Sequence, residues 1–589
     1  MIETVEILNR VESPEDLKKL TIEEMNILAQ EMRQGIINRV NILGGHLGPD
    51  LGIVEATIAL HYVFNAPKDK FVFDVSHQCY PHKMITGRKG AFFAPLEHPE
   101  ISGYFNPAEG VYDSFVIGHT STSISLATGV AKARDLKNEK YNVVALIGDG
   151  SLTGGEALEG LNNAALLNSN FIVVLNDNEM SIAENFGGIY SNLDELRRTN
   201  GQSINNFFKT MGYEYLYLEE GNDVEKLIDA FSKVKDTQKP IVVHIHTLKG
   251  KGYEPAVQNK ETYHWHIPNF LNQDETSAVQ VCESYEQITT DYILAKQKED
   301  KTVIAVNPAT PGAVGFYPEF RRLLGENYTD VGIAEEHAIG YISGLAKNGA
   351  KPILAVLSSF IQRTYDQLSQ DLALNNSPAT ILVFWGGISG ADATHLGVFD
   401  IPLISNIPNI VYLAPTCKEE YIKMLDWSVM QTDYPVAIRV PFGEILSSGQ
   451  EDKTDYSILN KYELVNSGDT VAILGVGNFW SLAQNVKEEL KNKLGIDATL
   501  INPKFISGVD EELLNSLKAN HKVVITLESG VLDGGFGEKI SRFYGNSGIK
   551  VLNFGAEKEF TDRIPYEQLA QKYHLTKELI VSDIEKLLK

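Results

Sequence analysis

Short apolar runs that end in Gly, Asp or Asn constrain the fold of this chain more than any other feature. Two such runs, rich in β-branched residues, lie at 141–150 (YNVVALIGDG) and 170–178 (NFIVVLNDN), and an Ala/Leu-rich stretch with helical spacing separates them at 156–167. Buried parallel strands have this composition. A strand, a helix and a strand within about 30 residues form a βαβ unit with a right-handed crossover. The sequence therefore predicts a doubly wound α/β domain here.

The same pattern recurs twice further along the chain. A second block contains five runs, at 302–309, 352–360, 379–387, 409–415 and 435–441, and a third contains four, at 470–477, 497–505, 522–529 and 550–556. Two polar stretches, at 257–277 and 447–457, are the expected linkers. We expect an α/β fold class with three consecutive doubly wound domains, over residues 1–277, 278–446 and 458–589.

Composition narrows the class of protein. Hydrophobic residues make up 43% of the 589 positions and charged residues 22%, which is typical of an ordinary globular protein. The 52 Lys and Arg against 77 Asp and Glu give a formal net charge of −25. Since nucleic acids and anionic membranes are bound largely through Lys and Arg, neither is an expected partner. A small anionic substrate stays compatible, because an acidic protein can hold a local basic pocket.

Signals for targeting, membrane insertion and disulfide bonding are missing from the sequence. The first twenty residues mix charges and lack an apolar core of roughly 7–15 residues, so we expect no signal peptide. No run of about 18 apolar residues predicts a membrane span. Cys79, Cys282 and Cys417 are far apart and form no CxxC pair, which argues against a disulfide framework or a thiolate metal site. These features predict a cytoplasmic enzyme.

Polar residues at the ends of two neighbouring strands indicate a site for a metal and a diphosphate. Asp149 lies between Gly148 and Gly150 after the first strand, and Asn178 follows 29 residues later at the end of the second. The carboxyl ends of neighbouring parallel strands meet at the crevice where open α/β sheets bind ligands. Carboxylate, amide and backbone oxygens suit Mg²⁺ held together with a diphosphate. A helix beginning near Thr153 would direct N–H groups at the same anion.

Longer strings carry a resemblance to a known family. GDG followed by NDN at this spacing resembles the thiamine diphosphate (ThDP) binding motif; a turn after a strand would explain GDG alone. The chain further resembles the 1-deoxy-D-xylulose-5-phosphate synthases, a branch of the transketolase-like ThDP enzymes, in strings such as GGHLGPDLGIVEATIALHYVFN (44–65), FDVSHQCYPHKMITGR (73–88), LNDNEMSIAEN (175–185) and IAEEHAIGYISGLAKNGAKPI (333–353). The resemblance runs in order along nearly the whole chain.

The resemblance implies a transferase of aldehyde or ketone residues that depends on ThDP and Mg²⁺. Such an enzyme decarboxylates pyruvate and transfers the two-carbon unit to glyceraldehyde 3-phosphate, forming 1-deoxy-D-xylulose 5-phosphate for isoprenoid biosynthesis. It also implies small-molecule substrates and a homodimer. A transketolase with a ketose donor is less favoured, because the strings specific to the synthase family dominate.

The resemblance assigns cofactor roles position by position. Glu335 matches the glutamate that binds N1′ of the aminopyrimidine and thereby favours loss of the proton at thiazolium C2. Phe360 matches the aromatic residue that stacks on the pyrimidine. The other matched cofactor contacts are His77, Gly118, His119, Thr120, Gly150, Ser151, Asn178 and Tyr253, and the matched metal ligands are Asp149, Asn178 and the backbone carbonyl of Met180.

Substrate roles follow from the same matches. His46 and His77 match the histidines that line the substrate channel, and Asp392 and His395 match a pair that handles protons on donor and acceptor. Arg363 matches a polar acceptor contact, and His264 and Lys249 match positions near the active site. Taken singly, each histidine would be a structural residue and Glu335 a helix N-terminal carboxylate favoured by the helix dipole. The number of matches favours the functional interpretation.

Three positions of the acceptor half depart from the family. Trp385 and Phe442 stand where the family has phosphate-binding arginines, and Leu357 stands where it has a tyrosine. Each charge-assisted Arg contact is worth roughly 1.5–3 kcal/mol, so a phosphorylated aldehyde should bind weakly. Two alternatives therefore stay open: the same pyruvate-derived chemistry with a different, unphosphorylated aldehyde, and a catalytically silent ThDP-binding paralogue. Retention of Asp149, Asn178 and Glu335 argues against the silent paralogue.

Overall fold

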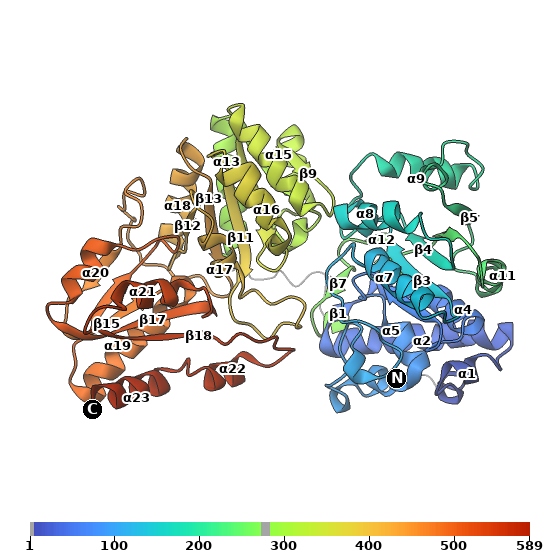
Figure 1. Cartoon of the computed structure of the whole chain (residues 1–589), viewed down its shortest axis with the longest axis horizontal. Coiled ribbons are helices and arrows are strands. Elements are labelled where there is room, and N and C mark those ends of the chain that lie inside the picture. The colour runs from blue at the N-terminus through green and yellow to red at the C-terminus, as the bar shows by residue number, and fades with distance from the viewer. Residues whose placement is uncertain (1–4, 273–282) are drawn as a thin grey trace. The chain divides into compact units, whose positions relative to one another are not determined.

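The computed structural model describes residues 5–272 and 283–589, which form two compact units (Figure 1). The first unit holds the described residues up to 272 together with Gly332–Ala334, and the second holds the others. Among the described residues, no helix combines the length and the apolar character that a membrane crossing requires.

One five-stranded parallel sheet organises the first unit. Its strands lie in the order β2-β3-β4-β6-β5, with β2 at Lys70–Phe73, β3 at Val143–Gly148, β4 at Phe171–Asp177, β5 at Glu214–Leu218 and β6 at Pro240–His246. The strands predicted at 141–150 and 170–178 are β3 and β4. Helix α8 (Gly155–Ala164) connects them, where the sequence predicted a helix. The predicted βαβ unit is therefore present.

Alternate side chains of these strands pack into two separate cores. Phe71 and Phe73 of β2 pack with helices α2 (Ile22–Leu43), α4 (Val54–Val63) and α11 (Val224–Val234). Val72, between them, packs on the opposite side with α7 (Ser123–Leu136) and α8. Because successive strand residues point to opposite faces of a sheet, helices cover both faces. This is the doubly wound arrangement that the sequence predicted.

The second unit contains two further sheets. The first is six-stranded and parallel in the order β12-β13-β11-β10-β8-β9, with β8 at Val303–Asn307, β9 at Tyr328–Asp330, β10 at Lys351–Leu357, β11 at Thr380–Gly386, β12 at Val411–Leu413 and β13 at Val436–Pro441. The second has the order β14-β16-β15-β17-β18, with β14 at Glu463–Asn466, β15 at Thr470–Gly475, β16 at Thr499–Asn502, β17 at His521–Val531 and β18 at Lys550–Ala556. Only β14 is antiparallel to its neighbour.

Helices cover these two sheets as well. Helix α21 (Phe536–Tyr544) lies on one face of the last sheet, and α19 (Trp480–Leu494) and α23 (Lys577–Leu588) lie on the other (Figure 1). One continuous core joins residues of both sheets, including Val306 of β8 and Leu474 of β15. The α/β fold class is thereby confirmed for this unit. All nine predicted strands are present, and the two additional ones, β9 and β14, are short.

The two expected linkers differ from each other. Residues 447–457 contain no helix or strand, as expected. The stretch from 257 is only partly a linker, because β7 (Trp265–His266) folds back and pairs antiparallel with β1 (Gly45–His46). Gly44 has φ of 76°, and a Cβ there would lie 2.8 Å from the carbonyl oxygen of His266, so this close approach requires glycine. Positions 273–277 lie outside the described residues.

Candidate functional site

The ends of β3 and β4 bring Asp149 and Asn178 together. Gly148 pairs in register with Asn176, and the Asp149 N–H donates to the Asn176 carbonyl at 3.2 Å. The Asn178 N–H in turn donates to the Asp149 carboxylate, and both side chains are buried. The first unit therefore contains the adjacent carboxylate and amide that the motif spacing predicted.

These two side chains form an electrostatically incomplete site. Burial raises the pKa of Asp149 to about 7, with a further contribution from the charge of Asp177, although Asn185 donates a hydrogen bond to its Oδ2 at 2.6 Å. The amide oxygen of Asn178 is buried and makes no hydrogen bond within the described chain. A cation beside both oxygens would stabilise the ionised carboxylate and satisfy the amide oxygen, so the residues present fit Mg²⁺.

The site lacks enough protein ligands to hold a metal alone. No cluster of three or more His, Cys, Asp or Glu side chains suited to a metal occurs in the part of the chain that the structure describes. Met180 lies two residues beyond Asn178, after Glu179, whose φ of 62° turns the chain. A carboxylate, an amide and a backbone carbonyl leave positions for further oxygens, which a diphosphate would supply.

A cationic side chain lies next to the same carboxylate. The Lys249 Nζ donates to the Ser181 carbonyl at 2.6 Å, and the side chain is buried. Burial lowers the pKa of Lys249 to about 7, while the charge of Asp149 opposes this shift. An anion at this point would favour the charged ammonium, so Lys249 fits a phosphate contact.

The segment with Gly118, His119 and Thr120 is fixed beside the GDG turn. The Asp74 carboxylate accepts hydrogen bonds from the backbone N–H groups of Ser121 at 2.7 Å and Ser123 at 3.0 Å. The Ser121 hydroxyl then donates to the carbonyl of Ser151 at 2.8 Å. Asp74 was not among the predicted site residues, although it lies within the string 73–88 that carries the family resemblance.

The GDG turn itself is tightly packed. Gly150 and Ser151 lead through a 3₁₀ turn, η5 (Ser151–Thr153), into α8. A Cβ on Gly154 would lie 2.1 Å from the Ser121 hydroxyl oxygen, so only glycine fits there. The predicted phosphate and pyrimidine contacts at Gly118–Thr120 and Gly150–Ser151 therefore lie on adjoining segments.

Three histidines gather at the junction of β1 and β7. The ring centroid of His46 lies 4.9 Å from that of His77 and 5.4 Å from that of His264. Burial holds the pKa of His264 well below its ordinary value, and the nearby charge of Lys249 lowers it further, so this imidazole is neutral. Tyr253, at the start of α12 (Glu254–Gln258), packs edge-on to Tyr263 at 5.6 Å. His264 thus joins the predicted pair from a stretch expected to be a linker.

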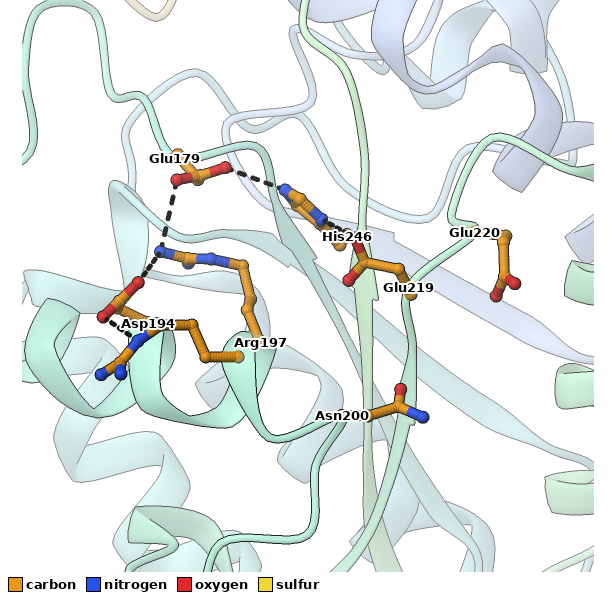
Figure 2. Close-up of a pocket in the computed structure, with 8 residues that line it drawn as sticks. Glu179, Asp194, Arg197, Asn200, Glu219, Glu220 and His246 are labelled. Atoms are coloured by element: carbon orange, nitrogen blue, oxygen red, sulfur yellow. Dashed lines mark hydrogen bonds and ion pairs between the residues drawn. The ribbon is translucent and has the colours of Figure 1, made fainter.

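The middle residue of the NDN motif faces another network. Asp177 forms an ion pair with Arg197 and a hydrogen bond with His244, whose Nε2 lies 2.9 Å from its Oδ2; burial lowers the pKa of His244, so this imidazole is neutral. Burial raises the pKa of Asp177, but these partners outweigh burial and the net shift is downward. Arg197 also lies in an open pocket of about 510 Å³ with Glu179 and other charged residues (Figure 2). The pocket contains none of the predicted site residues.

In the second unit, Glu335 is the first residue of α15 (Glu335–Lys347) and is buried. Burial raises the pKa of its carboxyl, and the guanidinium of Arg363, with Nη1 at 3.6 Å from Oε2, opposes the shift. Oε2 makes no hydrogen bond among the described residues. Such a carboxyl suits a contact with a ring nitrogen that carries or loses a proton.

A series of contacts connects the remaining predicted residues of this unit to that carboxyl. Phe360 and Arg363 share one 3₁₀ turn, where the Arg363 N–H donates to the Phe360 carbonyl at 3.2 Å. The Phe360 ring packs edge-on to His395 at 5.6 Å. The His395 N–H donates to the carbonyl of Asp392 at 2.9 Å, and the carboxylate of Asp392 lies 3.7 Å from Arg563. The second unit therefore joins its five predicted residues through these contacts.

The two aromatic residues that differ from the family pattern, Trp385 and Phe442, are also neighbours. Trp385 is the second-to-last residue of β11, Phe442 follows β13, and the two strands pair in the sheet. Their ring centroids are 6.2 Å apart at 72°, and the residues are 43% and 57% exposed. Leu357, at the end of β10, is buried. An apolar surface thus occupies the position where the resemblance places a phosphate contact.

Sequence profiles match nearly the whole chain. The profile described as 1-deoxy-D-xylulose-5-phosphate synthase matches residues 8–206 and 197–247, the transketolase pyrimidine-binding domain matches 241–445, and the transketolase C-terminal domain matches 460–580. The 1-deoxy-D-xylulose-5-phosphate synthases of Halothermothrix orenii and Carboxydothermus hydrogenoformans are each 37% identical over 99% of this chain, covering 97% and 99% of their own lengths. A transketolase structure from Leishmania mexicana is 14% identical, with a TM-score of 0.44, over 96% of this chain and 97% of its own.

Proposed function

This chain belongs to the 1-deoxy-D-xylulose-5-phosphate synthase family, and we propose that it joins pyruvate to glyceraldehyde 3-phosphate with loss of CO₂. The product is 1-deoxy-D-xylulose 5-phosphate, as used in isoprenoid biosynthesis. The observation that carries the proposal is the pairing of buried Asp149 with the unpartnered amide oxygen of Asn178 at the strand ends. We also propose that Mg²⁺ is the metal and that the enzyme is a cytoplasmic homodimer.

The first unit supplies the anchoring residues. Asp149, Asn178 and the Met180 carbonyl would hold Mg²⁺ together with the diphosphate, and Lys249 would add a positive charge. When bound, ThDP supplies the electron sink that takes up the electron pair left by departing CO₂. Tyr253 and the segment Gly118–Thr120 would complete the cofactor contacts of this unit.

Glu335 has the environment of an acid–base group. Its buried carboxyl, with a raised pKa and an oxygen that lacks a hydrogen bond, favours sharing a proton with N1′ of the aminopyrimidine. Arg363 limits the upward shift of the pKa, so the carboxyl remains able to ionise. Phe360 offers a ring face for the pyrimidine, and its edge-on neighbour His395 lies close enough to act on the same substrate.

The histidine cluster contains a neutral proton carrier. His264 is uncharged because burial lowers its pKa, and His46 and His77 lie within 6 Å of its ring centroid. A neutral imidazole both donates and accepts a hydrogen bond. This cluster therefore suits binding of a 2-oxo acid and removal of a proton from a reacting hydroxyl group.

A second candidate is the same pyruvate chemistry with an unphosphorylated aldehyde. The exposed pair of Trp385 and Phe442 favours it, since these side chains offer no charge for a phosphate. The silent paralogue is disfavoured, because Asp149, Asn178 and Glu335 are retained in buried, strained electrostatic environments that serve no purpose in packing.

One assay separates these candidates. The protein is incubated with ThDP, Mg²⁺, pyruvate and either glyceraldehyde 3-phosphate or unphosphorylated aldehydes, and CO₂ and the ketose products are measured by mass spectrometry. We expect 1-deoxy-D-xylulose 5-phosphate, with Glu335→Gln as the inactive control. CO₂ release with product only from unphosphorylated aldehydes would favour the second candidate. No pyruvate consumption with any acceptor would leave only the silent paralogue.

A further inference from the structure

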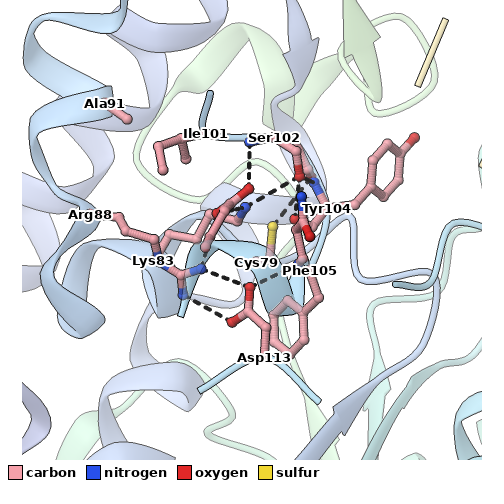
Figure 3. A network of polar contacts seen from close by, with 12 residues as sticks. Cys79, Lys83, Arg88, Ala91, Ile101, Ser102, Tyr104, Phe105 and Asp113 are labelled. Atoms are coloured by element: carbon pink, nitrogen blue, oxygen red, sulfur yellow. Dashed lines mark hydrogen bonds and ion pairs between the residues drawn. The ribbon is translucent and has the colours of Figure 1, made fainter. Parts of the chain in front are cut away.

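Four charged side chains form a buried network in the first unit that the proposed mechanism does not use. The Lys83 Nζ lies 2.6 Å from Glu109 Oε2, and the Arg88 Nη1 lies 2.7 Å from Asp113 Oδ2 and 3.1 Å from Glu109 Oε2 (Figure 3). All four are almost completely buried. Because removing ions from water is costly, such a cluster persists only where its geometry is closely satisfied.

The two carboxylates of this network also fix backbone. The Glu109 Oε1 accepts a hydrogen bond from the Ser102 N–H at 2.8 Å, and the Asp113 Oδ2 accepts one from the Asn106 N–H at 2.9 Å. These contacts hold the segment 102–106 at both of its ends. The network therefore positions whatever side chains this short segment carries.

The centre of the segment is fixed as well. The Cys79 thiol donates to the Gly103 carbonyl at 3.2 Å, and the Phe105 N–H donates to the Ser76 hydroxyl at 2.9 Å. Tyr104 lies between these two anchored positions. The backbone of Tyr104 is consequently held on both sides, and none of these contacts involves its side chain.

The ring of Tyr104 projects toward the histidine cluster. Figure 3 shows the phenol pointing away from the charged network, and its ring centroid lies 5.8 Å from that of His46 at an interplanar angle of 76°. His46 in turn packs against His77 and His264. Tyr104 therefore contributes a fourth ring to the cluster that we assign to the 2-oxo acid.

Resting on the proposed function, we propose that Tyr104 binds the donor substrate through its phenol hydroxyl, which donates a hydrogen bond to an oxygen of the 2-oxo acid. A phenol donates to a carboxylate without introducing a charge of its own. Hydrogen bonds to charged groups are stronger than those between neutral groups. Lys83, Arg88, Glu109 and Asp113 are then positioning residues that act through the segment 102–106.

The kinetic test removes one hydroxyl at a time. Tyr104→Phe keeps the ring and its packing on His46, and Tyr112→Phe makes the same chemical change eight positions along the same stretch of chain. We expect Tyr104→Phe to raise KM for pyruvate about tenfold, because one hydrogen bond to the charged substrate is lost. The effect on kcat should be smaller. Tyr112→Phe should leave both constants unchanged.

A second readout needs neither cofactor nor turnover. In protein labelled with ¹³C at Cε1 of histidine, the His46 resonance is assigned by its loss in His46→Gln and followed in the absence of ThDP. Tyr104→Leu should shift it, because the aromatic ring current is removed, whereas Tyr104→Phe should leave it in place. An unshifted resonance in Tyr104→Leu would contradict the packing on which the inference rests.

The outcomes separate the inference from the proposed function. Equal KM values for wild type, Tyr104→Phe and Tyr112→Phe, in an active wild-type enzyme, overturn the role of Tyr104 and leave the proposed function standing. A wild-type protein that consumes no pyruvate overturns the proposed function and the donor role of Tyr104 together. A raised KM in Tyr104→Phe alone, with an unchanged His46 resonance, supports the inference.

Discussion

Replacing Asp149 by Asn should stabilise the protein in the absence of metal and ThDP while abolishing its metal-dependent binding of ThDP. Burial raises the pKa of Asp149 to about 7, far above the value of about 3.9 expected in the unfolded chain. Between these two values the folded state binds a proton that the unfolded state lacks. Stability conferred by the protonated carboxyl therefore falls as the pH rises from about 4 to about 7.

The size of the effect follows from the shift. A difference of about three pKa units corresponds to at most about 4 kcal/mol at pH 8, and to about 1–2 kcal/mol at pH 5. Asn resembles the protonated carboxyl in shape and carries no charge, so it avoids this cost at every pH. For the unfolding transition of a unit of this size, we expect Tm to rise by roughly 5 °C at pH 8 and by less at pH 5.

Asp177→Asn is a matched control of opposite sign. Its carboxylate is buried in the same motif, but the hydrogen bond with His244 and the ion pair with Arg197 lower its pKa. The stability that its charge provides is present above the unfolded pKa and is lost as the pH falls through the lower folded value. Asp177→Asn should therefore lower Tm at pH 8, where Asp149→Asn raises it.

Differential scanning fluorimetry at pH 5 and pH 8, with and without ThDP and Mg²⁺, measures these effects. Ligand addition should raise Tm of the wild type and leave Asp149→Asn unchanged. A lower Tm for ligand-free Asp149→Asn at pH 8, or an increase of equal size at both pH values, would refute the electrostatic reasoning. Stabilisation of Asp149→Asn by ThDP and Mg²⁺ as large as that of the wild type would refute the metal assignment.

Three further predictions follow from the site. Glu335→Gln should bind ThDP with near wild-type affinity by calorimetry, because the change removes no residue that anchors the cofactor. Its rate of CO₂ release should fall at least about a hundredfold, because proton transfer is lost, and wild-type turnover would exclude the acid–base role of Glu335. Introducing Arg at both Trp385 and Phe442 should raise kcat/KM for glyceraldehyde 3-phosphate by on the order of tenfold per restored contact, and an unchanged or lower value in the double variant would contradict the premise. Arg88→Met should lower the free energy of unfolding by about 3–5 kcal/mol in denaturant titrations, because Asp113 stays buried but loses its ion-pair partner. A loss below about 1 kcal/mol would show that the charged network contributes little to stability.

The sequence predicted β3, β4, the helix between them and the juxtaposition of Asp149 with Asn178 for a simple physical reason. Parallel strands joined by one crossover helix place their carboxyl ends side by side, so residues that follow β3 and β4 must meet. The strands themselves are identified by continuous runs of β-branched residues, because both of their faces are buried. The short strands β9 and β14 lack such runs and were missed; β2, β5 and β6 of the first unit were missed as well, although β6 carries such a run.

Other parts of the site depend on irregular segments that carry no periodic signal. The return of the chain from 257 to pair β7 with β1 places His264 beside His46, but the local sequence is polar and resembles a linker. A pair of glycines directly before His46 is the only local indication of the close approach. Tyr104 likewise reaches the cluster because Glu109 and Asp113, themselves paired with Lys83 and Arg88 from another part of the chain, hold the segment 102–106, and no spacing rule predicts this.

The two aspartates at the ends of β3 and β4 differ in their surroundings: Asp177 is paired within the protein, whereas Asp149 is not. Asp177 is paired with the Arg197 guanidinium and hydrogen-bonded to His244, which together lower its pKa, and these contacts fix the end of β4 without any ligand. Asp149 has a buried environment that opposes its charge, and its neighbour Asn178 keeps an amide oxygen without a hydrogen bond. A fold selected for stability alone would neutralise or remove both features, since each one costs free energy in the isolated protein. A cation bound at the strand ends would offset both costs, so the proposed metal site predicts that the added stability of Asp149→Asn and its loss of ThDP binding appear together.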